Sequence, residues 1–267
     1  MQNARGAVPD RQPESPEGAE VRPTVVLVHG TRMSRAQWDR YPALLPGVDV
    51  LSVDLPGHGD RAGEEFTEEA ALRTIDDAVA RAGTATAPVL VGHSLGGYLA
   101  MMWAAEHPRD LAALVLVGAS AVPAGPLTGL YRGFARLLPV VGPDRMARVV
   151  NRLLRALGAE RGPGAPPLPD GAGYAALPAA WALVMRRARP ELLTGVEAPV
   201  VLVNGQLDQM RVHVRRFARA CQDPRVVLVP RASHLLPLTH PEQVARVVRE
   251  VLDGHRSGPA VAPTLEG

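Results

Sequence analysis

The sequence of 267 residues contains no lysine, so all 29 basic residues are arginine. These oppose 27 acidic residues and give a net charge of +2, which does not favour a nucleic-acid-binding protein. There is one cysteine, Cys221, so an intrachain disulfide is excluded. Aromatic residues make up only 4% of the chain, and the core must therefore be built mostly from Leu, Val and Ala.

Long apolar segments are also missing. No stretch reaches about 18 uninterrupted apolar residues, so no membrane span is expected. Residues 1–22 are polar and rich in Pro and Gly, without the layout of a signal peptide, and predict a disordered leader, as residues 254–267 predict a disordered tail. Together these features predict a cytoplasmic protein. The sequence contains no Cys/His cluster and no phosphate loop, so neither a metal nor an organic cofactor is expected.

Short apolar runs alternate with longer helical patterns along the chain. Six runs are rich in Val and Leu at both odd and even positions, which is typical of strands buried on both faces of a parallel sheet. These runs are Thr24–Val28, Val48–Val53, Pro88–Val91, Leu111–Val117, Pro199–Val203 and Arg225–Val229. The helical patterns are Glu68–Arg81, Leu95–Glu106, Val212–Ala220 and Pro241–Leu252. The alternation predicts an α/β fold with a doubly wound, mostly parallel sheet.

Residues 120–190 break the alternation, because they contain no convincing strand. Three helical patterns lie in this interval: about Leu127–Leu138, Pro143–Leu157 and Gly173–Arg189. An all-helical insert between two strands predicts a cap over the sheet. The core of the domain is then formed by residues 23–119 and 191–253.

The strongest local motif is Gly92-His93-Ser94-Leu95-Gly96. It follows one expected strand and opens an expected helix, so Ser94 is placed on a sharp strand-to-helix turn that exposes its hydroxyl. The helix N-terminus there favours the negative charge that develops in acyl transfer. Ser94 is therefore the candidate nucleophile.

A serine hydroxyl needs a base, and histidine suits that role because its pKa lies near neutral pH. His234 is the best candidate, because it lies in the loop between the last strand and the last helix. His240 precedes a proline and indicates a turn, and His213 lies in a helical pattern and is expected at the surface. His255 falls in the tail.

The base needs a carboxylate to orient it. Asp208 follows a buried strand, and such loops lie at the carboxyl edge of a parallel sheet, where ligands bind. Asp223 is a competitor, but it precedes the last strand and belongs to the opposite edge. No acid directly follows the Leu111–Val117 strand. The order Ser94, Asp208, His234 is the one expected for this arrangement.

An oxyanion requires two N–H donors close to the nucleophile. One is expected from the backbone of Leu95, directly after Ser94, and the other from the backbone of Thr31, in the loop after the first strand. His29 and Gly30 allow that loop to approach the nucleophile closely.

The motifs VVLVHG, DLPGHG, VGHSLGG, NGQLD and SHLLPLTHPE together resemble the α/β-hydrolase superfamily. The resemblance covers about residues 23–120 and 191–253. It implies the α/β-hydrolase fold, with the helical cap inserted after the sixth strand of that fold. It also implies that Asp54 and His58 belong to a structural loop, and Ser94 excludes the branches that use an aspartate nucleophile.

The expected activity is hydrolysis of a carboxylic ester on a small-molecule acyl substrate, through an acyl-enzyme at Ser94. Two alternatives remain open. The same triad cleaves thioesters or carbon–carbon bonds next to a carbonyl, and the fold also serves as a ligand sensor without catalysis. The sequence does not indicate the oligomeric state.

The charge of the expected cap allows two interpretations. Residues 120–190 carry ten arginines and three acids, a net charge of +7. Arginines that face the cleft would attract acyl groups with a negative charge. The spacings of Arg132/Arg136, Arg145/Arg148 and Arg152/Arg155 are instead typical of outer helix faces. The second interpretation is preferred, with an apolar inner face that includes Val149, and it predicts a neutral acyl pocket of medium length.

Overall fold

The computed structural model describes residues 21–83, 86–122 and 171–257, together with residues 142, 144–145, 148–149 and 151–152. Residues 1–20 and 258–267, which hold most of the expected leader and tail, lie outside the described residues. Among the described residues, no helix has the length and apolar character needed to cross a bilayer.

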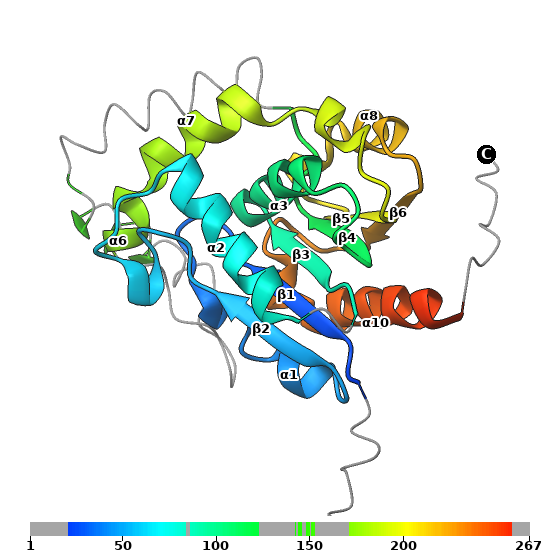
Figure 1. The fold of residues 1–267 in the computed structure, drawn as a ribbon. Coiled ribbons are helices and arrows are strands. Elements are labelled where there is room, and N and C mark those ends of the chain that lie inside the picture. The colour runs from blue at the N-terminus through cyan, green and yellow to red at the C-terminus, as the bar shows by residue number, and fades with distance from the viewer. Residues whose placement is uncertain are drawn as a thin grey trace, which may run out of the picture.

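Six strands form one sheet in the order β2-β1-β3-β4-β5-β6, and every neighbouring pair is parallel. The strands are β1 (Thr24–Val28), β2 (Asp49–Val53), β3 (Val89–His93), β4 (Ala113–Val117), β5 (Val200–Gly205) and β6 (Pro224–Val229). All six predicted strands are confirmed, with ends that differ by one or two residues. Because all strands run the same way, the loops that follow them meet at one edge of the sheet (Figure 1).

The central strands β1, β3, β4 and β5 are buried along their whole length, as two-sided apolar runs predict. The prediction was wrong for the two edge strands, β2 and β6, of which only the last residue is buried. The exposed apolar side chains of β6 lie on one face. Val226 and Leu228 are 46% and 49% exposed, and they share one face because side chains alternate along a strand. Val227 and Val229 on the other face pack against the second of the two cores described below.

The helices divide between the two faces of the sheet, as a doubly wound fold requires (Figure 1). Helices α2 (Glu68–Arg81), α3 (Leu95–Glu106) and α8 (Val214–Ala220) contribute to one apolar core. Helices α1 (Tyr41–Leu44) and α10 (Pro241–Ser257) contribute to the other. Helices α2 and α3 have the predicted bounds, whereas α10 continues past residue 252 into the expected tail.

Several short elements in the loops were not predicted. They are α9 (Leu236–Thr239) and the 3-10 helices η1 (Arg35–Trp38), η2 (Gly59–Arg61), η3 (Pro190–Leu193) and η4 (Gln209–Arg211). Each spans three or four residues, which is too short to show helical periodicity in a sequence.

The expected cap is described only in part. Its third helical pattern forms α6 (Gly171–Ala175) and α7 (Leu177–Arg187), and α7 packs against α3. The first pattern, 127–138, lies outside the described residues. The strand before this segment is β4, the fourth that the structure describes, whereas the resemblance numbers that position sixth.

Candidate active site

Ser94 lies between β3 and α3 in a backbone conformation that is rare for a residue with a side chain. Its φ is 50° and its ψ is −113°. Such a conformation is strained and persists only where the surrounding structure imposes it. The N–H of Ser94 donates to the carbonyl oxygen of Val117 at 2.9 Å, and its own carbonyl oxygen accepts from Tyr98 N–H at 3.0 Å. These bonds anchor the turn to β4 and to α3.

Gly92 allows the backbone to pass closely over itself at this turn. A Cβ atom at position 92 would lie 2.3 Å from the carbonyl oxygen of Gly96 and 2.6 Å from Cα of Gly97. Both contacts are with backbone, which cannot move aside without opening the turn. Gly92 therefore allows α3 to begin close to the end of β3, in the sharp turn that exposes Ser94 Oγ.

The structure brings Ser94, His234 and Asp208 together from three separate loops. Ser94 Oγ lies 2.9 Å from His234 Nε2, and His234 Nδ1 lies 3.0 Å from Asp208 Oδ1. Because an ionised carboxylate only accepts hydrogen bonds, the proton of His234 is on Nδ1. Nε2 is then free to accept the proton of the serine hydroxyl. This is the geometry of a nucleophile, a base and an orienting acid.

Asp208 is buried at the start of η4, where its Oδ1 also accepts from Met210 N–H at 2.8 Å. Burial by itself would raise the pKa of this carboxyl group. The hydrogen bond and charge interaction with His234, together with the Met210 N–H, outweigh burial and hold the pKa below its usual range. Asp208 is therefore ionised at neutral pH and able to orient the imidazole.

Leu95 and Thr31 occupy the positions expected for oxyanion donors. Leu95 is the first residue of α3, directly after Ser94, and Thr31 lies in the loop between β1 and η1. In the part of the chain that is described, neither backbone N–H is paired with an acceptor. Both N–H groups are therefore free to donate, as the predicted role of oxyanion donors requires.

The competing residues lie elsewhere. Asp223 is exposed and precedes β6, at the opposite edge of the sheet. The ring of His213 accepts a hydrogen bond from Val122 N–H at 3.0 Å, and His240 ends α9. Asp54 accepts from backbone N–H groups of Arg35 and Asp60, which matches a structural loop.

Two residues of this region were missed in the sequence. His93 and Gln37 are buried beside Ser94, and they contact each other through His93 Nδ1 and Gln37 Oε1 at 3.1 Å. His93 lies inside the nucleophile motif, so its proximity to Ser94 was visible. Nothing in the sequence around Gln37 indicated that it would reach the site.

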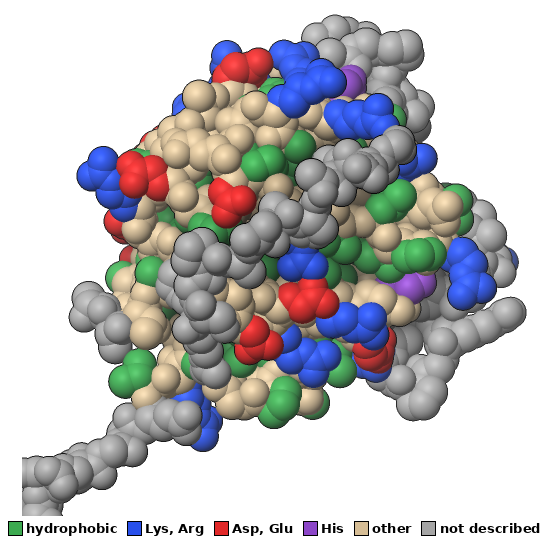
Figure 2. Space-filling view, turned by 90° about the vertical axis from the view of Figure 1, so that its right-hand side faces the viewer, with side chains coloured by type: hydrophobic (Ala, Val, Ile, Leu, Met, Phe, Trp, Pro, Cys, Tyr) green, Lys and Arg blue, Asp and Glu red, His purple; other side chains and the backbone are tan. Residues whose placement is uncertain are grey.

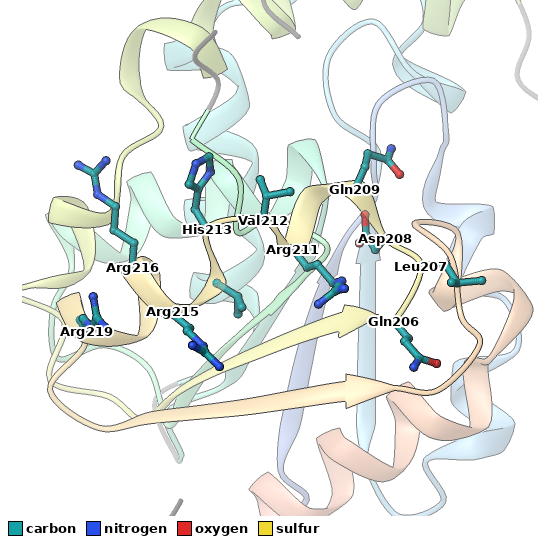
Figure 3. A pocket seen from close by; sticks show the side chains of 11 residues that line it. Gln206, Leu207, Asp208, Gln209, Arg211, Val212, His213, Arg215, Arg216 and Arg219 are labelled. Carbon is teal, nitrogen blue, oxygen red and sulfur yellow. The ribbon is translucent and has the colours of Figure 1, made fainter. Parts of the chain in front are cut away.

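A groove of about 800 Å³ lies beside Asp208, and neither Ser94 nor His234 lines it. Its arginines, which come from η4 and α8, are shown in Figure 3. The lining residues are Gln206, Leu207, Asp208, Gln209, Arg211, Val212, His213, Val214, Arg215, Arg216 and Arg219. The described residues contain no cluster of three or more His, Cys, Asp or Glu side chains that could bind a metal ion.

The described arginines of the expected cap do not point to an anion site. Arg186 and Arg187 of α7 lie 3.0 Å and 2.5 Å from carboxylate oxygens of Glu68 on α2. Arg145, Arg148 and Arg152 are exposed. Figure 2 likewise shows basic and acidic side chains interspersed on one face of the molecule. Val149, expected on the inner apolar face, is 65% exposed instead.

The fold agrees with the family comparison. The model of the alpha/beta hydrolase family matches residues 25–247, and the chain belongs to that family.

Among particular relatives, the chain is 29% identical to a pimeloyl-[acyl-carrier protein] methyl ester esterase of Neisseria meningitidis, over 91% of this chain and 99% of the relative. It is also 29% identical to the enzyme of the same name from Aromatoleum aromaticum, over 87% and 99%. Among solved structures, a thermophilic esterase from Thermogutta terrifontis is similar, with a TM-score of 0.71 and 24% identity over 87% of this chain and 90% of that chain.

Replacing the carboxylate that contacts His234 tests the arrangement. We expect Asp208→Asn to lower kcat for an ester by about three to four orders of magnitude, because an amide no longer selects the Nδ1–H form of the imidazole. Asp223→Asn is the matched control and should leave kcat unchanged, since Asp223 is exposed at the opposite edge. Steady-state kinetics of both variants decide the assignment, and equal losses would contradict it.

The pH profile tests the base. Burial lowers the pKa of His29 and of His93 to about 3, so both rings stay neutral above pH 5 or so. Asp208 stays ionised over the same range because its pKa is lowered. We therefore expect kcat/KM to fall as the pH is lowered toward 5, because a protonated histidine base can no longer accept the proton of Ser94. A profile that is flat down to pH 5 would exclude a histidine base.

Proposed function

We propose that this protein hydrolyses carboxylic esters through a triad of Ser94, His234 and Asp208 and an acyl-enzyme at Ser94. One observation carries the proposal: the continuous chain of contacts from Ser94 Oγ to His234 Nε2 at 2.9 Å, and from His234 Nδ1 to Asp208 at 3.0 Å. This chain lies at the strained strand-to-helix turn, at the carboxyl edge of the parallel sheet. Membership of the alpha/beta hydrolase family supports it.

The proposed mechanism has two halves. In the first, Ser94 Oγ attacks the acyl carbonyl while His234 Nε2 takes the hydroxyl proton, and the backbone N–H groups of Leu95 and Thr31 bind the oxyanion. The C–O bond to the alcohol then breaks, and His234 gives its proton to the leaving oxygen. In the second half, water attacks the acyl-enzyme and gives a proton to His234. The bond between the acyl carbon and Ser94 Oγ then breaks, His234 returns the proton to Oγ, and the acid is released. Asp208 stabilises the positive imidazole in both halves.

The relatives support a proposal for the substrate class. Both esterases named above are described as acting on the methyl ester of an acyl group linked to an acyl carrier protein. We infer that this chain acts on an acyl ester of a small alcohol, and that the carrier-linked acyl methyl ester is the first natural form to assay. A neutral acyl chain is preferred, because the described arginines of α7 pair with Glu68 rather than with the site.

An activated acyl ester tests the function directly. We expect a burst of released alcohol equal to the enzyme concentration, followed by slower turnover, because acylation of Ser94 precedes hydrolysis. Ser94→Ala should abolish both phases.

The same acyl group presented as an oxygen ester, a thioester and a diketone separates the alternatives. The ester should give the highest kcat/KM. A higher kcat/KM for the thioester or for the diketone would show that the protein catalyses that reaction instead of ester hydrolysis. Binding without burst or turnover would indicate a sensor.

A further inference from the structure

His93 stands between two oxygen atoms at the back of the proposed site. Its Nε2 lies 2.9 Å from the backbone carbonyl oxygen of His234, and its Nδ1 lies 3.1 Å from Gln37 Oε1. The residue is only 2% exposed, so neither contact is replaced by water at the surface. The ring centroids of His93 and His234 are 5.0 Å apart. His93, the residue directly before the nucleophile, therefore contacts the loop that carries the base.

Gln37 extends this connection to the oxyanion loop. Its Oε1 accepts from the N–H of Gly30 at 3.1 Å, and Gly30 directly precedes Thr31. The approach is close, since a Cβ atom at position 30 would lie 2.6 Å from His93 Nδ1. One continuous chain of polar contacts thus joins Gly30, Gln37, His93 and His234.

The two oxygen atoms differ in whether another N–H group already donates a hydrogen bond to them. Burial, and the nearby charge of His234, lower the pKa of His93 to about 3, so the neutral ring carries one proton. Gln37 Oε1 already accepts from Gly30 N–H, whereas the described residues supply no other donor to the carbonyl oxygen of His234. The proton of His93 is therefore assigned to Nε2, where it donates to the carbonyl oxygen of His234. Nδ1 then carries no proton and forms no hydrogen bond with Gln37 Oε1, because both atoms are acceptors.

The loop that carries His234 needs such an anchor. It lies between β6 and α9, and Arg231 within it has a φ of 57°, which is unfavourable for a residue with a side chain. Its backbone bond to the loop after β5 runs through Ala232, whose carbonyl oxygen accepts from Leu207 N–H at 2.9 Å. Among the described residues, the His93 contact is the one that reaches the carbonyl oxygen of His234.

We propose that His93 is a positioning residue, whose Nε2–H holds the backbone carbonyl of His234 and so keeps the catalytic imidazole within hydrogen-bond distance of Ser94 and Asp208. This role rests on the proposed function, because it assigns His234 as the base. Loss of the contact should lower kcat with little change in KM, since the base is needed for the chemical step rather than for binding.

Three substitutions separate the two contacts of His93. The amide of His93→Gln reaches the position of Nε2 and can still donate to His234. His93→Asn reaches only the position of Nδ1 and is the matched control, and His93→Leu removes both contacts. We expect His93→Leu and His93→Asn to lower kcat about 10- to 100-fold, as loss of the hydrogen-bonded partners of other functional histidines does, and His93→Gln to restore most of it. Values of kcat are taken per active site, counted from the burst amplitude.

The pH profile gives a readout that a purely structural role would not move. A loosened His234 contacts Asp208 less well, so its positive form is less stabilised and the acid limb of kcat/KM should shift to lower pH in the Leu and Asn variants. The Gln variant should keep the limb of the parent protein. Restoration by Asn but not Gln would assign the role to the Gln37 contact and overturn the proposal. Reduced burst amplitude with unchanged kcat per site would show that His93 serves folding alone.

A measurement without turnover keeps this proposal separable from the proposed function. The proton between His234 Nδ1 and Asp208 should give a low-field NMR resonance in the parent protein and in His93→Gln, and should be broadened or shifted in His93→Asn. An unchanged resonance in all variants would overturn the positioning role whether or not the protein hydrolyses esters. A parent protein without ester turnover, but with the expected resonance pattern, would overturn the activity and retain the positioning.

Discussion

The strained backbone of Ser94 is the constraint on which the site depends. A φ of 50° at a non-glycine residue persists only because β3, α3 and the bond to Val117 impose it together. Gly92 lies so close to Gly96 that a side chain at position 92 would collide with the backbone of α3. This backbone conformation directs the hydroxyl of Ser94 away from the adjacent backbone, at the N-terminus of α3. The stability of the surrounding sheet therefore maintains the strained backbone conformation of Ser94.

The parallel sheet supplies the remaining parts of the site. Loops after β1, β3, β5 and β6 meet at one edge because all six strands run in the same direction. Residues far apart in the sequence, such as Ser94 and His234, come within 2.9 Å of each other in this way. Burial, hydrogen bonds and nearby charges then determine the charge states of the buried ionisable groups. The contacts with His234 and with Met210 N–H keep Asp208 charged, whereas burial keeps His93 neutral.

Much of this arrangement could be predicted from the sequence, for reasons that are local. The fully buried strands show as two-sided apolar runs. Helix α2 begins directly after Thr67, which caps it, and α3 begins directly after Ser94 within the nucleophile motif. Ser94, Asp208 and His234 follow from a motif and from chain order, and the structure brings them together. Their catalytic roles, and those of Thr31 and Leu95, remain predictions, as do the absence of a cofactor and the cytoplasmic location.

The parts that could not be predicted depend on tertiary contacts. The exposure of Val226 and Leu228 depends on how far the helices cover the edge strand β6, which no residue within the strand encodes. Gln37 reaches the site from η1, and His93 makes its two polar contacts with residues 56 positions before and 141 positions after it. The pairing of Arg186 and Arg187 with Glu68 likewise required the placement of α7 against α2.

The central claim is that Ser94 is activated by its surroundings. Its most direct test is reaction with a fluorophosphonate, followed by mass spectrometry of the peptide that carries the modification. The account predicts one phosphonyl group per chain, on Ser94, no labelling of a folded Ser94→Ala variant, and slow labelling when His234 is replaced by Ala. Modification of another residue, or labelling that persists in Ser94→Ala, would contradict it.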